Sequence, residues 1–563
     1  MIYDFTVPVP AIPGKVYIRK TKSGPAYVEY EYERVYNKEK KYNTPKRKPI
    51  GKLDPENPEQ MFPNENYYTY FPDAEIPEDK ISNRSACLRM GAYCVIKKII
   101  CDYGLDELLR PIIGRDTGLL LDLASYSIIC ENNAGQYYPD YAFNHPLFTD
   151  GMRLYSDSKV SEFLHDITRD QSVRFMNKWN ERHDKTEKVY ISYDSTNKIC
   201  QAGDIELVEF SRNAKSGNNA KPVFNYAVAY DTDNREPLFY EDYPGSIVDV
   251  SQLQYMISTV KGYGYTNLGF ILDRGYFSKD NIRAMDKQGY PFVMMVKGQK
   301  KLVNELILHA KGTFEEKRSC AVKEYGVYGT TITHPLYKED TENRYFHIFY
   351  NPTKNASERN QLEESLRRMG KTLEKMKYTD YRLDSAYIRY FDPIYSNDEK
   401  EVFLNAVERA DRIENQIRLC GYFAIITSEK MTAKEALLLY KRRDGSEKLF
   451  RGDKSYLGNK SERVYSTESA EAKIFVEFIG LIIRTKIYTY LKDELENHIG
   501  NPPYLTVPGA IKELDKIEMM QRIDQVYRLS HAVTKTQKSI LKAFGMSIKD
   551  IKSTANEIAK VLG

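Results

Sequence analysis

The sequence predicts a mixed α/β fold in the central part of the chain. From Val189 onward, short apolar runs typical of strands follow one another: VYISYD, FNYAVAYD, PLFYEDYPG, LGFILDRG and PFVMMVKG. One stretch with helical periodicity, DVSQLQYMISTVKGYG, precedes LGFILDRG. A further strand, GYFAIITS, is followed by a helix, TAKEALLLYKRR, after residue 420. Strands in both hairpin and strand–helix–strand order indicate a mixed sheet.

Length and composition indicate a folded protein with several parts. The 563 residues are several times longer than one core of ~100 to 150 residues. The 41% of hydrophobic and 29% of charged residues lie in the globular range. A net charge of +4 is too small for a uniformly basic nucleic-acid coat, so attraction to phosphate must be local. We find neither a signal peptide nor an apolar run of ~18 residues, and therefore expect no secretion and no membrane contact.

Changes in periodicity and composition divide the chain into six predicted stretches. They are a basic β-rich N-terminal region (1–80), a helical lobe (81–185), the first part of the α/β core (186–300), an insertion sub-domain with β content (301–420), the second part of the core (421–495) and a helical C-terminal tail (496–563).

The N-terminal region alternates apolar and charged residues from Val16 to about Asp54, which predicts a twisted hairpin or small sheet. Its later part combines Tyr36 and Tyr42 with one acid, Glu39, and many basic residues. These are Lys38, Lys40, Lys41, Lys46, Arg47, Lys48 and Lys52. Such a surface suits a DNA backbone, but a solvated hairpin edge protected by lysines would have the same composition.

Trp179 and the C-terminal tail each have two interpretations. Trp179, the single tryptophan, lies in an amphipathic helical pattern, which favours a core position over a base-stacking one. The tail from Arg528 carries a net charge of +5 and the amphipathic segment TKTQKSILKAFG. It is either a solvated helix pair or a contact for DNA or a second subunit.

Cysteine and histidine provide no zinc site. None of the seven cysteines belongs to a C-x-x-C pair, and none of the eight histidines belongs to an H-x-x-x-H pattern. The cysteines are expected to be reduced, as in a cytoplasm. Any metal ligands should therefore be oxygen atoms.

Two aspartates follow apolar strands of the predicted core. Asp194 lies near the end of VYISYDSTN, and Asp273 ends the run LGFILD. If the two strands run parallel, both carboxylates emerge at the same edge of the sheet, where the sites of α/β sheets collect. Taken singly, either residue could instead cap a helix or start a tight turn.

A further acid belongs to a regular pattern after the strand GYFAIITS. Tyr440, Arg443, Glu447 and Lys454 have the spacing Y-x2-R-x3-E-x6-K. Steps of three, four and seven place them on one helical stripe, provided that residues 444–446 do not break the helix. A solvated stripe with an Arg–Glu pair is the alternative interpretation.

The charge around Glu447 favours metal binding over proton transfer. Residues 441–460 contain seven Lys or Arg and three Asp or Glu, so this segment alone carries a net charge of +4. A carboxylate among cations is a poor proton donor but can hold a metal ion beside a phosphate.

With these residues the chain resembles the DDE transposases of bacterial insertion sequences, in the insertion-sequence-four superfamily that the Tyr-Arg-Glu-Lys signature defines. A strand followed by D-x-T, a second strand ending in L-D-R-G and the signature carry the resemblance. The segments YVEYEYERVYN, SKVSEFL and PLFYEDYPGSIVDVSQL are similar to the longer members. The resemblance covers most of the chain, from about residue 15 to the tail.

The resemblance implies a ribonuclease H-like catalytic domain interrupted by a β-containing insertion. The insertion would account for the 174 positions between Asp273 and Glu447. Asp194, Asp273 and Glu447 would form the catalytic triad and bind two divalent ions, normally Mg2+, which Mn2+ can replace. Two such ions can activate a water or a 3′-hydroxyl and stabilise the leaving oxygen.

The resemblance also implies how the chain meets DNA. Tyr440, Arg443 and Lys454 would hold the transposon end around the scissile phosphate, because Arg grips phosphate with two hydrogen bonds, Lys acts as a point charge and Tyr can stack or donate. The helical lobe (81–185) would bind DNA. The partners would be double-stranded DNA at the element ends and at the target, with the chain a homodimer on paired ends. It would work in a bacterial cytoplasm, associated with the nucleoid.

The resulting hypothesis is a transposase that binds the ends of its insertion sequence, cleaves DNA phosphodiester bonds and transfers the 3′ ends to target DNA. One alternative is a non-catalytic DNA-binding protein derived from a transposase. The other is a ribonuclease H-like nuclease without strand transfer. Nicking that requires all three acids separates the hypothesis from the first alternative, and joined products separate it from the second.

Overall fold

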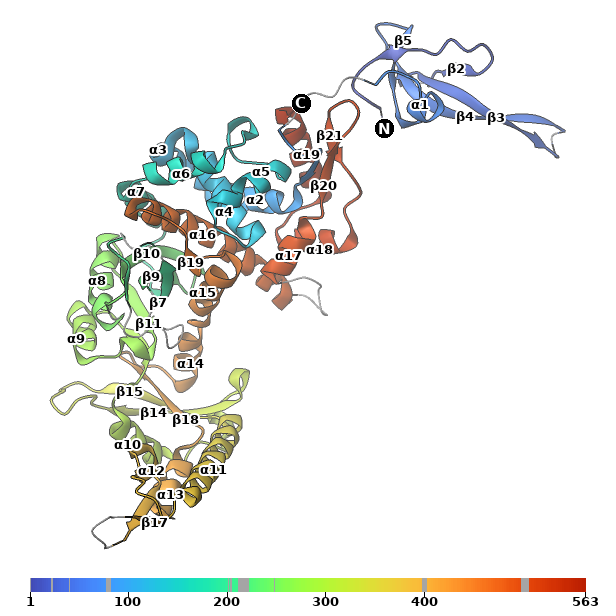
Figure 1. Ribbon diagram of the computed structural model, residues 1–563. Coiled ribbons are helices and arrows are strands. Elements are labelled where there is room, and N and C mark those ends of the chain that lie inside the picture. The colour runs from blue at the N-terminus through green and yellow to red at the C-terminus, as the bar shows by residue number, and fades with distance from the viewer. Residues whose placement is uncertain are drawn as a thin grey trace. The chain divides into compact units, whose positions relative to one another are not determined.

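The computed structural model describes most of the 563 residues (Figure 1). The described ranges are 2–21, 24–39, 41–76, 83–200, 202, 205–210, 222–247, 249–396, 402–497 and 506–562. Lys40 of the basic N-terminal run lies outside the described residues. The chain divides into two units. Unit 1 comprises Met1–Phe175, Gly452–Asn459 and Glu468–Gly563, and unit 2 comprises Met176–Arg451 and Lys460–Thr467.

An antiparallel sheet and one short helix form the N-terminal part of unit 1. The strands lie in the order β1-β5-β4-β3-β2. Val28, Ile50, Met61 and Tyr67 form the core of this part. The elements are β1 (Val7–Pro8), β2 (Val16–Arg19), β3 (Tyr27–Asn37), β4 (Tyr42–Leu53), β5 (Gln60–Pro63) and α1 (Glu65–Tyr70). β2, β3 and β4 fall within the stretch predicted to be extended.

Helices dominate the rest of unit 1. They are α2 (Gly91–Tyr103), α3 (Leu105–Ile113), α4 (Thr117–Cys130), α5 (Tyr138–Asn144), α6 (Asp157–Asp166), α7 (Arg169–Glu181), α16 (Thr467–Asn497), α17 (Val507–Leu514), α18 (Lys535–Ala543) and α19 (Ile548–Leu562). α4 and most of α16 are buried on all sides, because their apolar residues are not confined to one face. α7 continues into unit 2.

The C-terminal tail is not entirely helical, contrary to the expectation for residues 496–563. β20 (Glu518–Gln521) and β21 (Tyr527–Leu529) form a hairpin. β20 also pairs with β6 (Cys87–Arg89), far upstream in the chain. Segments as short as EMMQ and YRL carry no readable period, and their pairing depends on a distant strand.

Unit 2 is built on a mixed sheet, which confirms the predicted mixed α/β fold (Figure 1). The strands lie in the order β10-β9-β7-β11-β12-β18-β15-β14-β13. β7, β9 and β10 are antiparallel neighbours, whereas β7, β11 and β12 run parallel. The elements of the first half are β7 (Val189–Cys200), β8 (Glu209–Phe210), β9 (Pro222–Asp231), β10 (Glu236–Pro244), α8 (Asp249–Gly262), β11 (Leu268–Leu272), α9 (Lys279–Gln288), β12 (Phe292–Met295) and α10 (Lys300–Ala310).

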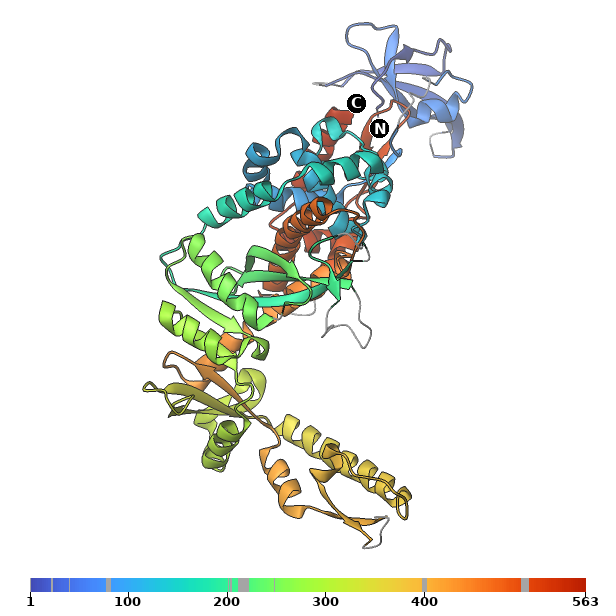
Figure 2. The same ribbon diagram turned by 60° about the vertical axis from the view of Figure 1, so that its left-hand side comes forward.

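The stretch 301–420 contributes both to this sheet and to a small core of its own. β13 (Ala321–Val322), β14 (Val327–His334) and β15 (Arg344–Tyr350) continue the sheet beyond β18 (Tyr422–Thr427), so residue 301 marks no boundary of the sheet. Beyond β15, a long helix lies beside a hairpin (Figure 2), and apolar residues such as Leu366 and Phe403 pack between them. These elements are α11 (Pro352–Lys375), α12 (Ser385–Ile388), β16 (Phe391–Tyr395), β17 (Phe403–Glu408) and α13 (Ala410–Leu419).

Trp179 occupies the core of unit 2, as its helical pattern predicts. Its side chain is 0% exposed, and its indole N–H donates to the Pro237 carbonyl at 2.8 Å. A base-stacking role for Trp179 is therefore excluded in this structure, because no face of the ring is free.

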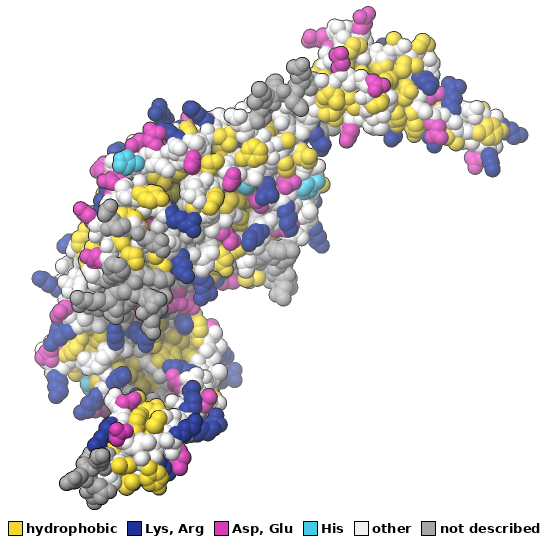
Figure 3. All heavy atoms as spheres, in the orientation of Figure 1, with side chains coloured by type: hydrophobic (Ala, Val, Ile, Leu, Met, Phe, Trp, Pro, Cys, Tyr) yellow, Lys and Arg dark blue, Asp and Glu magenta, His cyan; other side chains and the backbone are white. Residues whose placement is uncertain are grey.

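Acidic and basic side chains are interspersed over the face shown in Figure 3, in keeping with the small net charge. All seven cysteines are free. In the part of the chain that the structure describes, none of the helices combines the length and the apolar character needed to cross a bilayer.

His347 links three strands of the sheet through its ring. Its Nδ1 lies 2.9 Å from the Thr331 hydroxyl, and its Nε2 lies 2.9 Å from the Thr427 hydroxyl. Thr427 donates its proton to the Glu429 carbonyl, so Nε2 must donate and Nδ1 must accept. Complete burial lowers the pKa of His347 from 6.5 to about 4.

We predict that His347 makes the stability of unit 2 depend on pH. The unfolded chain binds a proton near pH 6.5 and the folded chain only near pH 4, so stability present above pH 6.5 falls by up to about 3 kcal/mol as the pH drops to 4. Urea unfolding, followed by Trp179 fluorescence, should show the His347→Gln variant losing this part of the pH dependence. An unchanged difference between variant and wild type from pH 7 to pH 4 would contradict the assignment.

Candidate functional site

Asp194 and Asp273 lie where the parallel pairing of β7 with β11 stops. The register pairs Tyr193 with Leu272, and each aspartate is the next residue of its chain segment. The two strands do run parallel, which is the condition under which both carboxylates emerge at the same edge of the sheet. Asp194 is not near the end of its strand, however, because β7 continues to Cys200 by pairing with β9.

The predicted helical stripe is split between two helices. α14 (Ala433–Lys441) ends before Arg443, and α15 (Asp444–Tyr456) begins after it. Asp444 starts the second helix instead of breaking a continuous one. The Glu447 N–H donates to the Arg443 carbonyl at 3.2 Å, so the backbone stays close to helical through the joint.

The first turn of α15 is fixed against β7 and β9. The hydroxyls of Ser192 on β7 and Ser446 on α15 lie 2.8 Å apart, and both side chains are buried. Gly445 approaches the Tyr230 ring so closely that a Cβ there would lie 2.8 Å from Cε1. The pair of hydroxyls and the close approach of Gly445 to Tyr230 thus hold Glu447 near β7, the strand that carries Asp194.

Arg443 stands among the three predicted catalytic acids. Its Nη1 lies 4.0 Å from Asp194 Oδ2 and 3.6 Å from Asp273 Oδ1. Its Nη2 donates to Glu447 Oε1. The Arg443 side chain is 15% exposed, whereas those of Asp194, Asp273 and Glu447 are 21%, 37% and 47% exposed, so the cation is the most enclosed member of the group. Carboxylates from a mid-strand position, a strand end and a helix therefore converge on one positive group.

The groups around Arg443 keep its side chain charged. Burial acts to lower the pKa of Arg443, but Tyr440, Asp273, Glu447 and Asp194 act against it and the pKa lies above its usual value. The group stays protonated at all accessible pH values.

Tyr440 is anchored by its ring. It packs with Ile271, Val293 and Phe349 in the apolar cluster beneath α14. Burial raises the pKa of Tyr440 to about 12, and its hydroxyl has no hydrogen-bond partner among the described residues. The guanidinium carbon of Arg443 lies 5.6 Å from its ring centroid.

Lys454 lies on α15, two turns beyond Glu447, and is half-buried. It belongs to unit 1, together with the rest of the segment Gly452–Asn459. Unit 2 therefore brings together five of the six predicted site residues.

The donor set suits a hard cation. Three carboxylates supply the oxygen ligands that Mg2+ prefers, and a cationic group already marks the position between them. As they stand, no three Asp, Glu, His or Cys side chains of the described residues are grouped closely enough to hold a metal ion. The acids are spaced around a guanidinium instead, so ion binding would require Arg443 to move.

Sequence patterns missed the residues that support the site from the other face of β7. The Tyr193 hydroxyl donates to Glu241 at 2.7 Å, and Gln252 donates to the same carboxylate at 3.1 Å. The Tyr193 ring also packs against Tyr276, just after Asp273, with centroids 5.6 Å apart. Strand parity could have identified Ser192, which shares a face with Asp194, but the partners of Tyr193 depend on tertiary packing.

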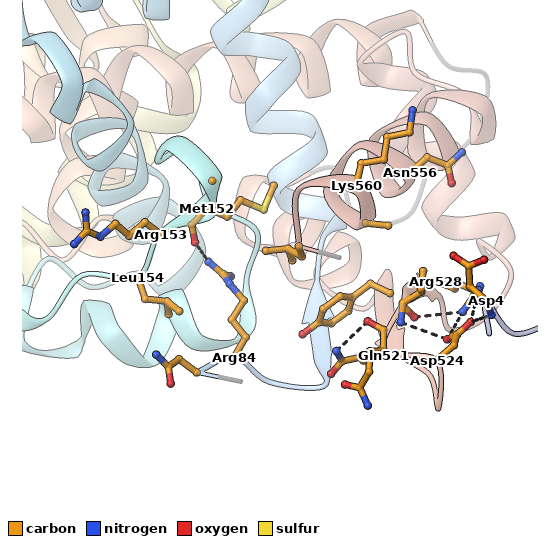
Figure 4. A pocket seen from close by; sticks show the side chains of 17 residues that line it. Asp4, Arg84, Met152, Arg153, Leu154, Gln521, Asp524, Arg528, Asn556 and Lys560 are labelled. Atoms are coloured by element: carbon orange, nitrogen blue, oxygen red, sulfur yellow. Dashed lines mark hydrogen bonds and ion pairs between the residues drawn. The ribbon is translucent and has the colours of Figure 1, made fainter. Parts of the chain in front are cut away.

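A cavity of ≈ 920 Å³ lies in unit 1 and contains none of the predicted site residues (Figure 4). Arg84 at its wall donates to the carbonyls of His145 and Met152. Arg528 pairs with Asp524 at 2.6 Å. Arg84 and Arg528 are therefore satisfied within the protein.

We predict a measurable coupling between Ser192 and Ser446. Ser192→Ala, Ser446→Ala and the double variant should give a coupling free energy of about 1 kcal/mol in urea unfolding, since one buried hydroxyl pair is shared. Ser195→Ala combined with Ser446→Ala is the control, because Ser195 lies on the opposite face of β7. Additive effects of the two alanines would show that this contact does not hold α15 on β7.

Comparison with known proteins identifies a family. Residues 186–483, more than half of the chain, match the family described as Transposase DDE domain. No curated protein matches the chain. The piggyBac transposase in a synaptic complex with hairpin DNA is 9% identical, with a TM-score of 0.36 over 84% of this chain and 83% of that chain. The Mos1 transposase in a paired-end complex with the left transposon end is 8% identical, with a TM-score of 0.14 over 40% of this chain and 65% of that chain.

The family match covers the whole segment that carries the mixed sheet, both aspartates and α15. The chain belongs to the Transposase DDE domain family.

Proposed function

We propose that this transposase cleaves DNA at the ends of its own insertion sequence and transfers the 3′ ends to a target duplex. The single observation that carries the proposal is the convergence of Asp194, Asp273 and Glu447 on one enclosed cation. Three acids that share one position are costly unless a cation balances them, and a phosphoryl-transfer site needs such a position.

We propose that the core is ribonuclease H-like and that the chain belongs to the insertion-sequence-four superfamily. The antiparallel strands β10-β9-β7, continued by the parallel strands β11 and β12, support the first proposal. The spacing of Tyr440, Arg443, Glu447 and Lys454 supports the second.

The triad would hold two Mg2+ ions, which Mn2+ could replace. When bound, such ions supply an activated water or 3′-hydroxyl and neutralise charge on the leaving oxygen. The protein's part is to present three carboxylates at a fixed spacing. β7, the end of β11 and the first turn of α15 provide that spacing.

Arg443 would serve both the resting and the DNA-bound site. In the resting site its guanidinium balances the acids. In the DNA-bound site it would release them and grip the scissile phosphate with two hydrogen bonds. The buried ring of Tyr440 would anchor the end of α14 while the neighbouring Arg443 guanidinium moves. Lys454 would add a point charge that attracts the DNA backbone.

The partners of this activity are double-stranded element ends and target DNA. We propose that a homodimer acts on paired ends, that the helical stretch 81–185 contributes to DNA binding, and that the protein works on nucleoid DNA in a bacterial cytoplasm. The division of the chain into six functional stretches stays a prediction. Proteolysis of the chain with and without an end duplex would show which stretches DNA protects.

Neutralising one triad acid should abolish DNA cleavage. Asp194→Asn and Glu447→Gln are expected to reduce Mg2+-dependent nicking of a transposon-end duplex by about a thousandfold or more, since several kcal/mol of metal-based stabilisation is lost. Asp233→Asn is the matched control, because Asp233 pairs with Arg442 next to the site and not with Arg443. Its nicking rate should stay within a few-fold of wild type.

The same assay distinguishes the alternatives. Intact metal-dependent cleavage in Asp194→Asn or Glu447→Gln would falsify the proposal. End binding by the wild type without nicks in Mg2+ or Mn2+ would favour a non-catalytic DNA-binding protein. Nicks without joined products would favour a nuclease that lacks strand transfer.

Removing Arg443 should tighten metal binding in the DNA-free protein. Arg443→Gln deletes a unit charge at about 4 Å, worth ~1 to 4 kcal/mol, so Mn2+ should bind about tenfold tighter or more by electron paramagnetic resonance. Arg442→Gln, one residue earlier and paired with Asp233, should leave Mn2+ affinity unchanged. Equal or weaker Mn2+ binding in Arg443→Gln would contradict competition between the guanidinium and the ions.

A further inference from the structure

The hairpin of β3 and β4 extends beyond the sheet to which it belongs. β2 pairs with β3 only at Tyr27–Tyr30, and β5 pairs with β4 only at Gly51–Leu53. From Tyr32 to Lys48 the two strands therefore pair only with each other, and we call this segment the ribbon (Figure 1). An isolated two-stranded ribbon is marginally stable in water, so its base needs support from neighbouring side chains.

A buried carboxylate supports the base of the ribbon. Glu31 is 4% exposed and accepts from Arg34 at 2.5 Å and from Arg47 at 3.3 Å. The guanidinium carbon of Arg47 also lies 3.6 Å from the ring centroid of Tyr17 on β2. Two arginines on one carboxylate leave an excess positive charge where the ribbon emerges.

The ribbon and its base carry a net positive charge. Residues 31–48 contain seven Lys or Arg and three Glu, so the net charge of this short segment is the same as that of the whole chain, +4. Lys46 pairs with Glu33 at 3.0 Å. Within the described ranges, no ion pair is found for Lys38, Lys41 or Lys48. Their charges are therefore available to a partner.

Large aromatic side chains lie in the open on both faces of the ribbon. Tyr36 is 59% exposed and Tyr42 is 55% exposed. Tyr36 pairs with Asn43 and Tyr42 with Asn37, so the two rings project from opposite faces. Figure 3 shows hydrophobic and Lys or Arg side chains side by side at the end of this hairpin. Lysines that only protected a sheet edge would not require exposed tyrosines beside them.

We propose that the ribbon binds double-stranded DNA in the major groove. A two-stranded ribbon fits the groove, which is about 12 Å wide. Lysines along its edges would reach the flanking phosphates, while the tyrosines would contact base edges and sugars. The inference rests on the proposed function in taking DNA as the substrate, but it does not depend on the carboxylates of unit 2.

The test compares two charge-matched variants of the full-length protein. Lys38→Gln/Lys48→Gln removes two ribbon charges, and Lys15→Gln/Lys20→Gln removes two exposed charges beside β2. Binding of a labelled duplex of about 20 base pairs would be measured by fluorescence anisotropy across a salt series in EDTA. The ribbon variant should lose roughly tenfold in affinity at ~0.1 M salt, and its salt slope should fall by about 1.8, whereas the control pair should keep the wild-type slope. Circular dichroism would verify that all variants fold.

A position-specific readout locates the contact. p-Benzoylphenylalanine at Tyr36 should cross-link to the duplex, and the same group at Tyr255, which is 65% exposed in unit 2, is the comparison. The inference is overturned if both charge variants lose affinity equally, if neither does, if Tyr36 gives no cross-link above Tyr255, or if ribbon-dependent binding prefers single-stranded RNA.

The outcome is separable from that of the proposed function. If the ribbon variant binds like wild type while Asp194→Asn still abolishes nicking, the ribbon inference fails and the proposed function stands. If the ribbon contacts the duplex but the wild type never nicks, the ribbon inference stands and the proposed function fails.

Discussion

One guanidinium balances three carboxylates that the fold draws to the same point. Without a positive group between them, Asp194, Asp273 and Glu447 would repel one another and loosen the contact of α15 with the sheet. The Arg443 guanidinium offsets that repulsion. The joint between α14 and α15 sets its position, because Arg443 lies in the turn that separates the two helices. The three carboxylates are therefore kept together by a cation that belongs to the protein.

The sheet supplies the rest of the geometry. Parallel pairing of β7 with β11 sets the two aspartates side by side, and pairing with β9 carries β7 past them as a rigid support. On one face Ser192 holds the start of α15, and on the other face Tyr193 is held by Glu241. Supports on both faces leave the strand little freedom to rotate, which keeps its carboxylate directed toward Arg443.

Much of this arrangement could be predicted from local patterns. Apolar runs ending in Asp194 and Asp273 indicated neighbouring strand positions, and the spacing from Tyr440 to Glu447 indicated a helical segment that presents an acid. The spacing left open a break at residues 444–446 but did not place the joint at Arg443, because the Glu447 N–H still donates to the Arg443 carbonyl and the backbone there stays close to helical. The hairpin of β20 and β21 was missed because its strands are short and because β20 pairs with distant β6. β14 and β15 were assigned to an insertion, yet they extend the sheet through β18, a long-range pairing that sequence periodicity does not report.

We propose that the position now filled by the Arg443 guanidinium is the cation position of a phosphoryl-transfer site. A crystal structure of the chain with a transposon-end duplex and Mn2+, located by its anomalous scattering, tests it most directly. We expect Mn2+ within about 2.2 Å of oxygens from Asp194, Asp273 and Glu447, with the Arg443 guanidinium turned onto a DNA phosphate. Mn2+ bound elsewhere, or Arg443 still seated between the three acids with DNA in place, would contradict it.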